Sequence, residues 1–462
     1  MKAALVRRTT AAPALHHHLT PVLGDIAPTR IAPILGPRMW WAGPLDVEGL
    51  LLGALQAALT AANDLLDHDR FAVDARQLST WTASPEHLRV DGRPLHPVEH
   101  PTRFFPCQDG WIRAHDSRPH HNHPPARCLH TDSPEALART MTAAQAEHLI
   151  REHGGTAAAV RTPQEWLASD MGRTVGARPW IDATLPDPDT SRIPENPPLR
   201  TLTGLQIIDL TDLALGPTST RLLALLGADV LRVIPPHRSA PTGRQLDTGF
   251  GKRTVEIDLA TTAGQDRLDE LLAGADAVVH SCHRQEDATC ALDIPATTRR
   301  HPHLAVVDIT AWGNTSPWRH EAGSDAVVQA ATGIAHLYSR PIHDTEEPAD
   351  VDITNPTLVW RPSPRKPRTL PVRALNQATG YGAAAATLAL IARRRRQGAA
   401  GTGRLSLART AHELLNLPSL DGTAQELPGT LHEIDSDYGL LTYARPAVLA
   451  GGVPVDYAGP PT

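Results

Sequence analysis

One carboxylate stands where a helix is expected to begin. Asp325 follows Gly323 and Ser324 and precedes the run AVVQAATGIAHL, whose apolar residues have helical spacing. The dipole of a helix favours the ionised form of a carboxylate in its first turn, and an ionised carboxylate can act as a nucleophile. The same position also suits a simple N-cap, the commoner role of an aspartate there on local sequence alone.

The segments around Asp325 predict an open α/β domain. From residue 200 onward, short apolar runs alternate with amphipathic stretches, which is typical of a mostly parallel, Rossmann-like sheet covered by helices on both faces. We expect strands at 205–210, 230–234, 255–259, 277–279 and 304–309. Thr262–Gln265 fits the capping pattern and is expected to cap a helix that runs through Leu272. The first strand is followed by DLTDLALGPTS without a GxGxxG pattern, so a nicotinamide-binding version is weakly supported.

The first half of the chain predicts a smaller α+β domain. Pro44–Leu66 carries small and apolar residues at helical spacing with few charges, which indicates a buried helix. Thr142–Gln145 and Thr162–Glu165 fit the capping-box pattern, and Pro163 stands at a first helical position. Both features predict helix starts.

A proline-dense stretch divides the chain. Residues 185–199 (LPDPDTSRIPENPPL) cannot continue a helix or a central strand, so we interpret them as a linker. The expected organisation is a small-domain-like segment at 1–184, this linker, an α/β domain at 200–415 and a C-terminal extension at 416–462.

Composition excludes several classes of protein. The chain has 462 residues, 41% hydrophobic and 20% charged, with a formal net charge of −6, which disfavours a disordered chain and a nucleic-acid reader. No run approaches the ~20 apolar residues of a membrane span, and the N-terminus lacks the apolar core of a signal peptide, so we expect a cytoplasmic protein. Four separated cysteines and scattered histidines predict neither disulfides nor a bound metal.

The second half resembles the family III CoA-transferases, the CaiB/BaiF group named after carnitine and bile-acid CoA-transferases, to which formyl-CoA transferases are similar. The resemblance covers most of residues 200–415 in the family's order. The segments that carry it are LTGLQIIDLTDLALGPTSTRLLALLGADVLRVIPP, GKRTVEIDL, HLAVVDITAWGNTSPW, AGSDAVVQAATGI and ALNQATGYGAAAATLAL.

The first half resembles the part of the same family that ordinarily follows the alanine-rich helix. The segments concerned are PLDVEGLLLGALQAALTA, FAVDARQL, FFPCQDGWIRAH and VRTPQEWLASD. The chain is therefore similar to a rearranged member of the family. The resemblance implies an interlocked homodimer, unless the first half already supplies the second set of segments and makes a single-chain pseudo-dimer.

The resemblance implies acyl-CoA:carboxylate CoA-transferase chemistry. Asp325 matches the reactive aspartate, which forms a mixed anhydride and then an aspartyl-CoA thioester. Coenzyme A and acyl-CoA would be substrates, a carboxylic acid would be the acceptor, and no cofactor would be permanently bound. The residues expected to contact CoA phosphates are Lys252, Arg253, Arg284 and Arg238. Trp40, Trp41 and Trp111 are candidate apolar walls for the acyl group.

Three departures from the family pattern leave alternatives open. Ile234 replaces a glutamate after the second strand, Gln285 follows Arg284 in place of proline, and Asn376 replaces an acid at the alanine-rich helix. A non-catalytic CoA-binding protein is one alternative. An acyl-CoA racemase or isomerase is another, although the residue before Asp325 is a serine and no histidine matches the His/Asp pair of that branch.

Overall fold

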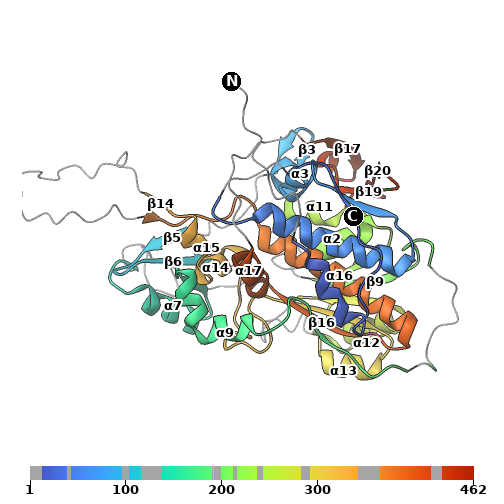
Figure 1. Ribbon diagram of the computed structural model, residues 1–462, viewed down its shortest axis with the longest axis horizontal. Coiled ribbons are helices and arrows are strands. Elements are labelled where there is room, and N and C mark those ends of the chain that lie inside the picture. Colours follow the sequence, from blue (N-terminus) through green and yellow to red (C-terminus); the bar gives the residue numbers. More distant parts are fainter. Residues whose placement is uncertain are drawn as a thin grey trace, which may run out of the picture.

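A seven-stranded, mostly parallel sheet is the largest sheet among the described residues. Figure 1 labels two of its strands, β9 and β16. In the computed structural model, the described residues are 13–38, 43–95, 103–115, 138–189, 191, 199–211, 216–236, 243–281, 292–341, 365–417 and 429–462. The strand order is β11-β10-β9-β12-β13-β16-β8, and only β8 is antiparallel to its neighbour. The strands are β8 Asp182–Thr184, β9 Gln206–Leu210, β10 Asp229–Ile234, β11 Arg253–Glu256, β12 Ala277–His280, β13 Ala305–Thr310 and β16 Gly401–Ser406.

Helices cover both faces of this sheet. On one face, α10 (Pro217–Leu225) and α16 (Ala374–Gln397) pack on Ile207, Val279 and Val307. On the other, α12 (Thr262–Gly274) and α13 (Ile294–Arg300) pack on Ile208, Val278 and Val306. The alternation follows from the two-residue period of a strand. The expected parallel α/β sheet is confirmed.

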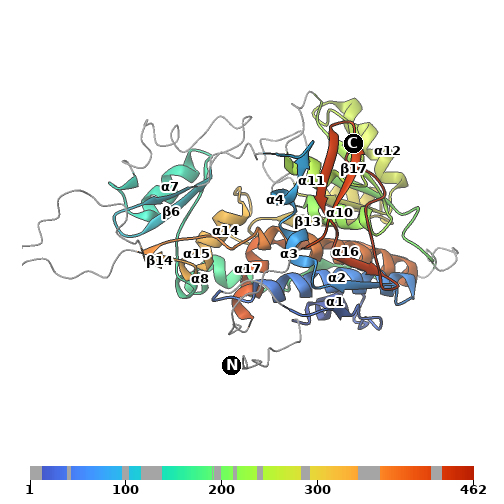
Figure 2. The ribbon, with the colours of Figure 1, turned by 90° about the horizontal axis from the view of Figure 1, so that it is seen from above.

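The first half of the chain is not packed separately from the second. Helix α2 (Val47–Leu66) lies along α16 (Figures 1 and 2), and only Gln56 of its twenty residues is not buried. Residues on both sides of the predicted linker share one hydrophobic core. Within the described residues, α2 is also the helix that is long and apolar enough to cross a membrane, but 94% of the tested window is buried inside the protein, as in a core helix.

Two smaller sheets join the first half to the C-terminal segment. One has the order β1-β2-β19-β20 and the other β17-β18-β3-β4. Their strands are β1 Ile34–Leu35, β2 Phe71–Asp74, β3 Arg89–Val90, β4 Arg93–Pro94, β17 Leu431–Ser436, β18 Gly439–Ala444, β19 Val448–Ala450 and β20 Val453–Pro454. The C-terminal extension thus completes sheets that begin in the first half.

A third small sheet packs on the helix that begins with Asp325. Strands β5 (Arg103–Pro106), β6 (Trp111–His115) and β7 (Thr156–Ala159) are antiparallel neighbours. One face holds α7 (Ala143–Glu152), and the other lies against α14 (Asp325–Ala331). Figure 2 shows this unit at one end of the molecule, beside α14.

The capping predictions agree with the structure at two of three sites. Thr142 and Thr162 form complete capping boxes with Gln145 and Glu165, and Pro163 begins its helix. The third cap is Thr261 rather than Thr262, because the Thr261 hydroxyl accepts the bond from the amide of Gly264.

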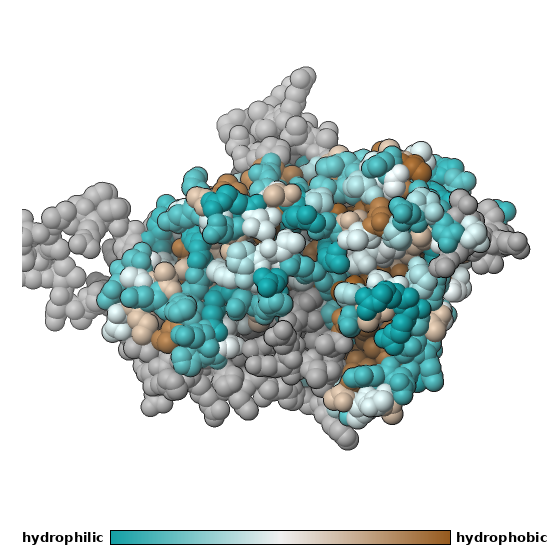
Figure 3. All heavy atoms as spheres, turned by 90° about the horizontal axis from the view of Figure 1, so that it is seen from below, coloured by the Kyte–Doolittle hydropathy of each residue, from teal (hydrophilic) through white to brown (hydrophobic). Residues whose placement is uncertain are grey.

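The remaining elements are short apart from α17. They are η1 Leu15–His18, α1 Leu19–Val22, α3 Leu78–Thr82, α4 Ser84–His87, α8 Pro163–Ala168, α9 Asp170–Gly176, α11 Gly243–Gly249, α15 Ile334–Leu337, α17 Leu407–Asn416, β14 Arg340–Pro341 and β15 Arg365–Lys366. The face in Figure 3 shows hydrophobic residues in scattered areas among hydrophilic ones. In the part of the chain that the structure describes, no group of three or more metal-ligating side chains occurs.

Candidate functional site

The carboxylate of Asp325 lies buried between the N-terminal ends of two helices. Asp325 is the first residue of α14 and is only 4% exposed. Its Oδ2 accepts a hydrogen bond of 2.8 Å from the backbone amide of Asn376, in the first turn of α16. The N-cap residue of α16 makes no side-chain cap bond, so Asp325 caps that helix from another element. Two helix dipoles therefore act on one carboxylate.

The second carboxylate oxygen is held by its own helix. Asp325 Oδ1 accepts a short hydrogen bond from the side-chain amide of Gln329, one turn later. The Oε1 of Gln329 in turn accepts a 2.8 Å bond from the amide of Leu370. Gln329 is 2% exposed, so packing and these two hydrogen bonds hold its side chain in place.

The protonation of Asp325 is set by opposing effects. Burial raises its pKa to about 6, whereas bonds from the Asn376 amide, the Gln329 side chain and the Leu375 amide, together with the charge of Arg113, act to lower it. At neutral pH the carboxylate is mostly ionised, yet its proton affinity is far above that of an ordinary aspartate. This combination gives a carboxylate that is poorly solvated and still anionic, as a carboxylate nucleophile requires.

Unpaired polar atoms surround the carboxylate. The hydroxyl of Ser324 and the side-chain oxygen of Asn376 are buried and have no hydrogen-bond partner among the described residues. Buried polar groups are normally paired. The hydroxyl of Ser324 and the side-chain oxygen of Asn376 can therefore form further hydrogen bonds beside Asp325.

An arginine from the first half of the chain faces the same carboxylate. Arg113 lies on β6, which packs against α14, and its positive charge acts on Asp325. Burial lowers the pKa of Arg113 to about 10, so it remains charged at neutral pH. Sequence reasoning missed Arg113, because it precedes Asp325 by more than two hundred positions and no local pattern marks it.

The loop that leads to Asp325 is fixed by stacked aromatic and cationic side chains. The guanidinium of Arg151 lies 3.6 Å from the ring centre of Trp318, and the rings of Trp312 and Trp318 meet edge to face at 4.8 Å. The indole NH of Trp312 donates to the carbonyl of Ala322, three residues before Asp325. Stacking of this kind restrains the position of the helix start.

Lys252 lies in the protein interior rather than at a phosphate site. Its ammonium donates to Asp209 at 2.9 Å, to Thr220 at 2.7 Å and to the carbonyl of Pro217 at 3.2 Å. An ammonium has three donors, and the lysine side chain is 1% exposed. No donor is left for a ligand, so the structure argues against Lys252 as a contact of CoA phosphates and assigns it to a buried ion pair.

Arg253 lies at the opposite end of the sheet from the expected ligand edge. It begins β11 and pairs with Asp229, the first residue of β10, through bonds of 2.8–3.0 Å. Ligands of open α/β sheets bind at the carboxyl ends of the strands, whereas this pair lies at their amino ends. The position of Arg253 therefore does not fit the predicted contact with CoA.

The other predicted residues are only partly described. Arg284, Arg238, Trp40 and Trp41 lie outside the described residues, as does Gln285. Trp111 is half-buried at the start of β6. Ile234 ends β10, and Asn376 contributes its backbone amide to Asp325 rather than an acid.

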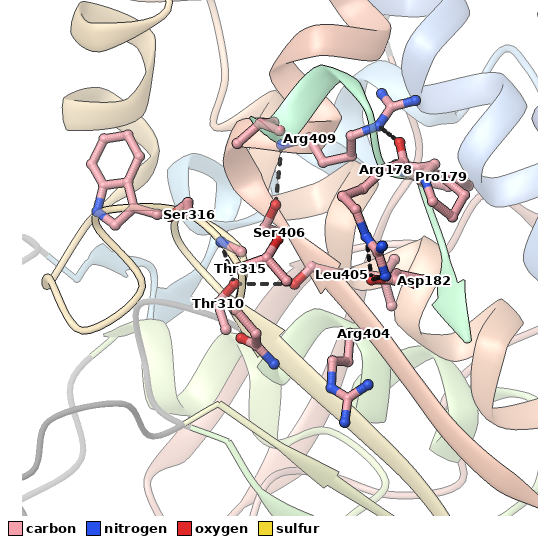
Figure 4. Close-up of a pocket in the computed structure, with 15 residues that line it drawn as sticks. Arg178, Pro179, Asp182, Thr310, Thr315, Ser316, Arg404, Leu405, Ser406 and Arg409 are labelled. Atoms are coloured by element: carbon pink, nitrogen blue, oxygen red, sulfur yellow. Dashed lines mark hydrogen bonds and ion pairs between the residues drawn. The ribbon is translucent and has the colours of Figure 1, made fainter. Parts of the chain in front are cut away.

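A surface pocket opens at the carboxyl ends of β13 and β16 (Figure 4). Its walls include Thr310 and Ser406 from the strand ends and the arginines 178, 404 and 409. Asp182 also lines the pocket and pairs with Arg178 at 2.5 Å. Three guanidinium groups against one carboxylate make the pocket cationic. Asp325 is not part of its lining.

Comparisons with known proteins give a consistent family. The model of CoA-transferase family III matches residues 202–434. The succinate–glutarate CoA-transferase of Agrobacterium fabrum is 29% identical over 30% of this chain and 40% of its own length. The formyl-CoA:oxalate CoA-transferase of Escherichia coli is 28% identical over 29% of this chain and 35% of its own length.

A crystal structure shows a similar partial match. Rv3272 of Mycobacterium tuberculosis, in its orthorhombic form, is 26% identical with a TM-score of 0.38, and the match covers 46% of this chain and 56% of that one. This chain thus spans about half or less of the length of the relatives that it matches in sequence, with shares of 40%, 50% and 35% for three of them.

Proposed function

The chain belongs to CoA-transferase family III, and from that premise we propose that it transfers coenzyme A from an acyl-CoA to a free carboxylic acid, with Asp325 as the covalent acceptor. The observation that carries the proposal is the Asp325 carboxylate itself. It is buried at the first residue of α14, it accepts a hydrogen bond from the first turn of α16, and its pKa is raised to about 6.

The reaction divides into balanced covalent steps. A carboxylate oxygen of Asp325 attacks the thioester carbon of acyl-CoA, a C–O bond forms, the C–S bond breaks, and the electron pair leaves on the CoA thiolate. The thiolate then attacks the aspartyl carbonyl of this mixed anhydride and releases the donor as a free carboxylate, which leaves an aspartyl-CoA thioester. The acceptor carboxylate repeats the two steps in reverse order. The covalent intermediates divide one difficult acyl exchange into easier steps, which lowers the overall barrier.

The surroundings of Asp325 suit these steps. The backbone amide of Asn376 and the amino ends of α14 and α16 can stabilise negative charge that develops on the aspartyl carbonyl. Oδ1 accepts one hydrogen bond from Gln329, and its remaining lone pair can attack the thioester carbon.

The CoA nucleotide would lie along the carboxyl edge of the large sheet. Arg238 and Arg284 follow the ends of β10 and β12 in the sequence, and these two strands flank β9 on either side. The order of the sheet reverses at β9, and ligands of open α/β sheets bind at such a point. We retain both arginines as the proposed phosphate contacts in place of Lys252 and Arg253.

Intact-protein mass spectrometry tests the proposal. The protein is incubated with propionyl-CoA or succinyl-CoA and acid-quenched, and its mass is expected to rise by that of CoA less one water. Asp325→Asn should abolish the adduct, whereas Asp170→Asn, at a carboxylate whose side chain is 82% exposed, should retain it. An adduct that persists in Asp325→Asn, or its absence with both donors, would refute the covalent role.

A second candidate function is proton exchange at the α-carbon of an acyl-CoA. The observation that favours it is a buried pair on the neighbouring inner strands β12 and β13, in which His280 Nδ1 and Asp308 Oδ1 are 3.0 Å apart. Such a pair suits proton transfer in an acyl-CoA racemase. Deuterium incorporation into a chiral 2-methylacyl-CoA without an acceptor acid would favour this function over transfer. CoA binding with neither exchange nor adduct would favour a non-catalytic binding protein.

A further inference from the structure

Arg113 projects from the small sheet toward the helix that begins with Asp325. Its neighbours on β6, Ile112 and Ala114, point to the opposite face, where they pack with α7. The cross-strand partners of Arg113 are Phe104 and Ala158, and both belong to the core on the α14 side. Because side chains alternate along a strand, Arg113 shares that face, and β6 packs against α14 there.

The guanidinium of Arg113 is unusually short of partners. Among the described residues it forms no hydrogen bond and no ion pair, and its Nε is buried without an acceptor. Within the same part of the chain it stacks on the ring of Phe104, 4.3 Å from the ring centre. The side chain as a whole is half-buried. A buried guanidinium normally has a carboxylate or carbonyl partner. The N–H groups of Arg113 are therefore available to bind an anion.

The reaction proposed above changes the charge that Arg113 faces. In the resting protein the Asp325 carboxylate supplies a compensating negative charge. Once Asp325 carries CoA as a thioester, that charge is gone, and a half-buried cation remains without compensation. Leaving a buried charge unpaired is strongly unfavourable. At this stage a free carboxylate, the acceptor acid, must enter the site.

We propose that Arg113 binds the carboxylate of the acceptor acid while Asp325 carries CoA, so that the acid replaces the charge that the thioester has removed. The inference rests on the proposed transferase function and assigns its acceptor subsite. One acceptor oxygen stays on the guanidinium, and the other attacks the aspartyl thioester carbon. A C–O bond forms, the C–S bond breaks, and the electron pair leaves on the CoA thiolate. Stacking on Phe104 occupies one face of the guanidinium and leaves its edge for the carboxylate, as planar recognition requires.

Calorimetry with propionate as the probe tests the subsite without turnover. Asp325→Asn removes the resident charge as the thioester does, so this variant should bind propionate at least tenfold more tightly than the unmodified protein at pH 7.5. Adding Arg113→Gln to Asp325→Asn should abolish the gain, and Arg113→Lys should restore part of it. Arg103→Gln, at an exposed arginine on β5, is the matched control and should change nothing.

A second variant keeps the test decisive if Arg113→Gln folds poorly. Phe104→Glu places a carboxylate directly across the strands from Arg113 and should block propionate binding in the Asp325→Asn background while the arginine remains. Propionate binding by Asp325→Asn that is unaffected by both Arg113→Gln and Phe104→Glu would overturn the inference, whether or not the unmodified protein forms a CoA adduct. Arg113-dependent propionate binding in a protein that forms no adduct would support the subsite and refute the transferase function.

Discussion

Replacing Asp325 by asparagine should stabilise the protein at neutral pH while removing its proposed activity. The pKa of Asp325 is raised from 3.8 to about 6 by burial. At about 1.4 kcal/mol for each pH unit, the ionised carboxylate costs the folded state about 3 kcal/mol at neutral pH. A nucleophile kept poorly solvated is expected to carry such a penalty, because active-site groups are often held at the expense of stability.

The sign of this effect depends on pH in a defined way. A carboxyl group whose pKa is higher in the folded than in the unfolded state contributes stability when protonated, and that contribution is lost as the pH rises from 3.8 through about 6. Asp325→Asn has no such dependence. Its advantage in unfolding free energy over the unmodified protein should therefore grow by about 2 kcal/mol between pH 4.5 and pH 8.

Urea unfolding followed by tryptophan fluorescence measures this difference across the pH range. The asparagine amide will meet the donor of Gln329, but that cost is independent of pH and leaves the slope unchanged. Asp170→Asn, at an exposed carboxylate, should show a difference that is small and flat. A flat difference for Asp325→Asn between pH 4.5 and pH 8, or one that shrinks as the pH rises, would contradict the burial argument.

Three further substitutions test the roles assigned to Lys252 and Arg253 and the packing at Gly333. Lys252→Met leaves Asp209 charged and buried, so the unfolding free energy should fall by about 3–5 kcal/mol; a loss of CoA affinity at unchanged stability would instead restore the phosphate role. Arg253→Gln breaks an exposed pair, so stability should change by about 1 kcal/mol or less and the dissociation constant of CoA, measured by calorimetry, should stay the same. Gly333→Ala forces a Cβ to 2.3 Å from a proline nitrogen of α8 at a φ of +88°, so the thermal midpoint should drop by an amount matching about 2 kcal/mol or more; an unchanged midpoint would mean that α8 moves freely away.

The large sheet could be predicted because its signals are local. Its inner strands are continuous apolar runs. The starts of α7 and α8 could be predicted for the same reason, because Thr142 and Thr162 accept hydrogen bonds from backbone amides three residues later. The errors are also local in origin. The apolar run predicts a strand at 255–259, whereas β11 ends at Glu256, because its partner β10 ends at Ile234 and two prolines follow.

The candidate site could be predicted only in part, because its partners come from distant elements. Resemblance to a family indicated Asp325, but no local signal indicates that the amide of Asn376 caps it from another helix. For Lys252 the resemblance implied a contact with CoA phosphates. Only the fold shows that Asp209, on β9, lies 2.9 Å away and pairs with its ammonium.

The arrangement of the site also bears on the rearranged segment order that the resemblance implies. The family model matches residues 202–434, which include Asp325 but not Arg113. Yet the small sheet that carries Arg113 packs on α14, and α2 lies along α16, whose first turn is capped by Asp325. Side-chain packing depends on which surfaces meet and not on which segment is made first, provided that the connections can span the distance. A first half that covers Asp325 from within the same chain can therefore give this carboxylate a cationic neighbour that the matched region alone does not contain.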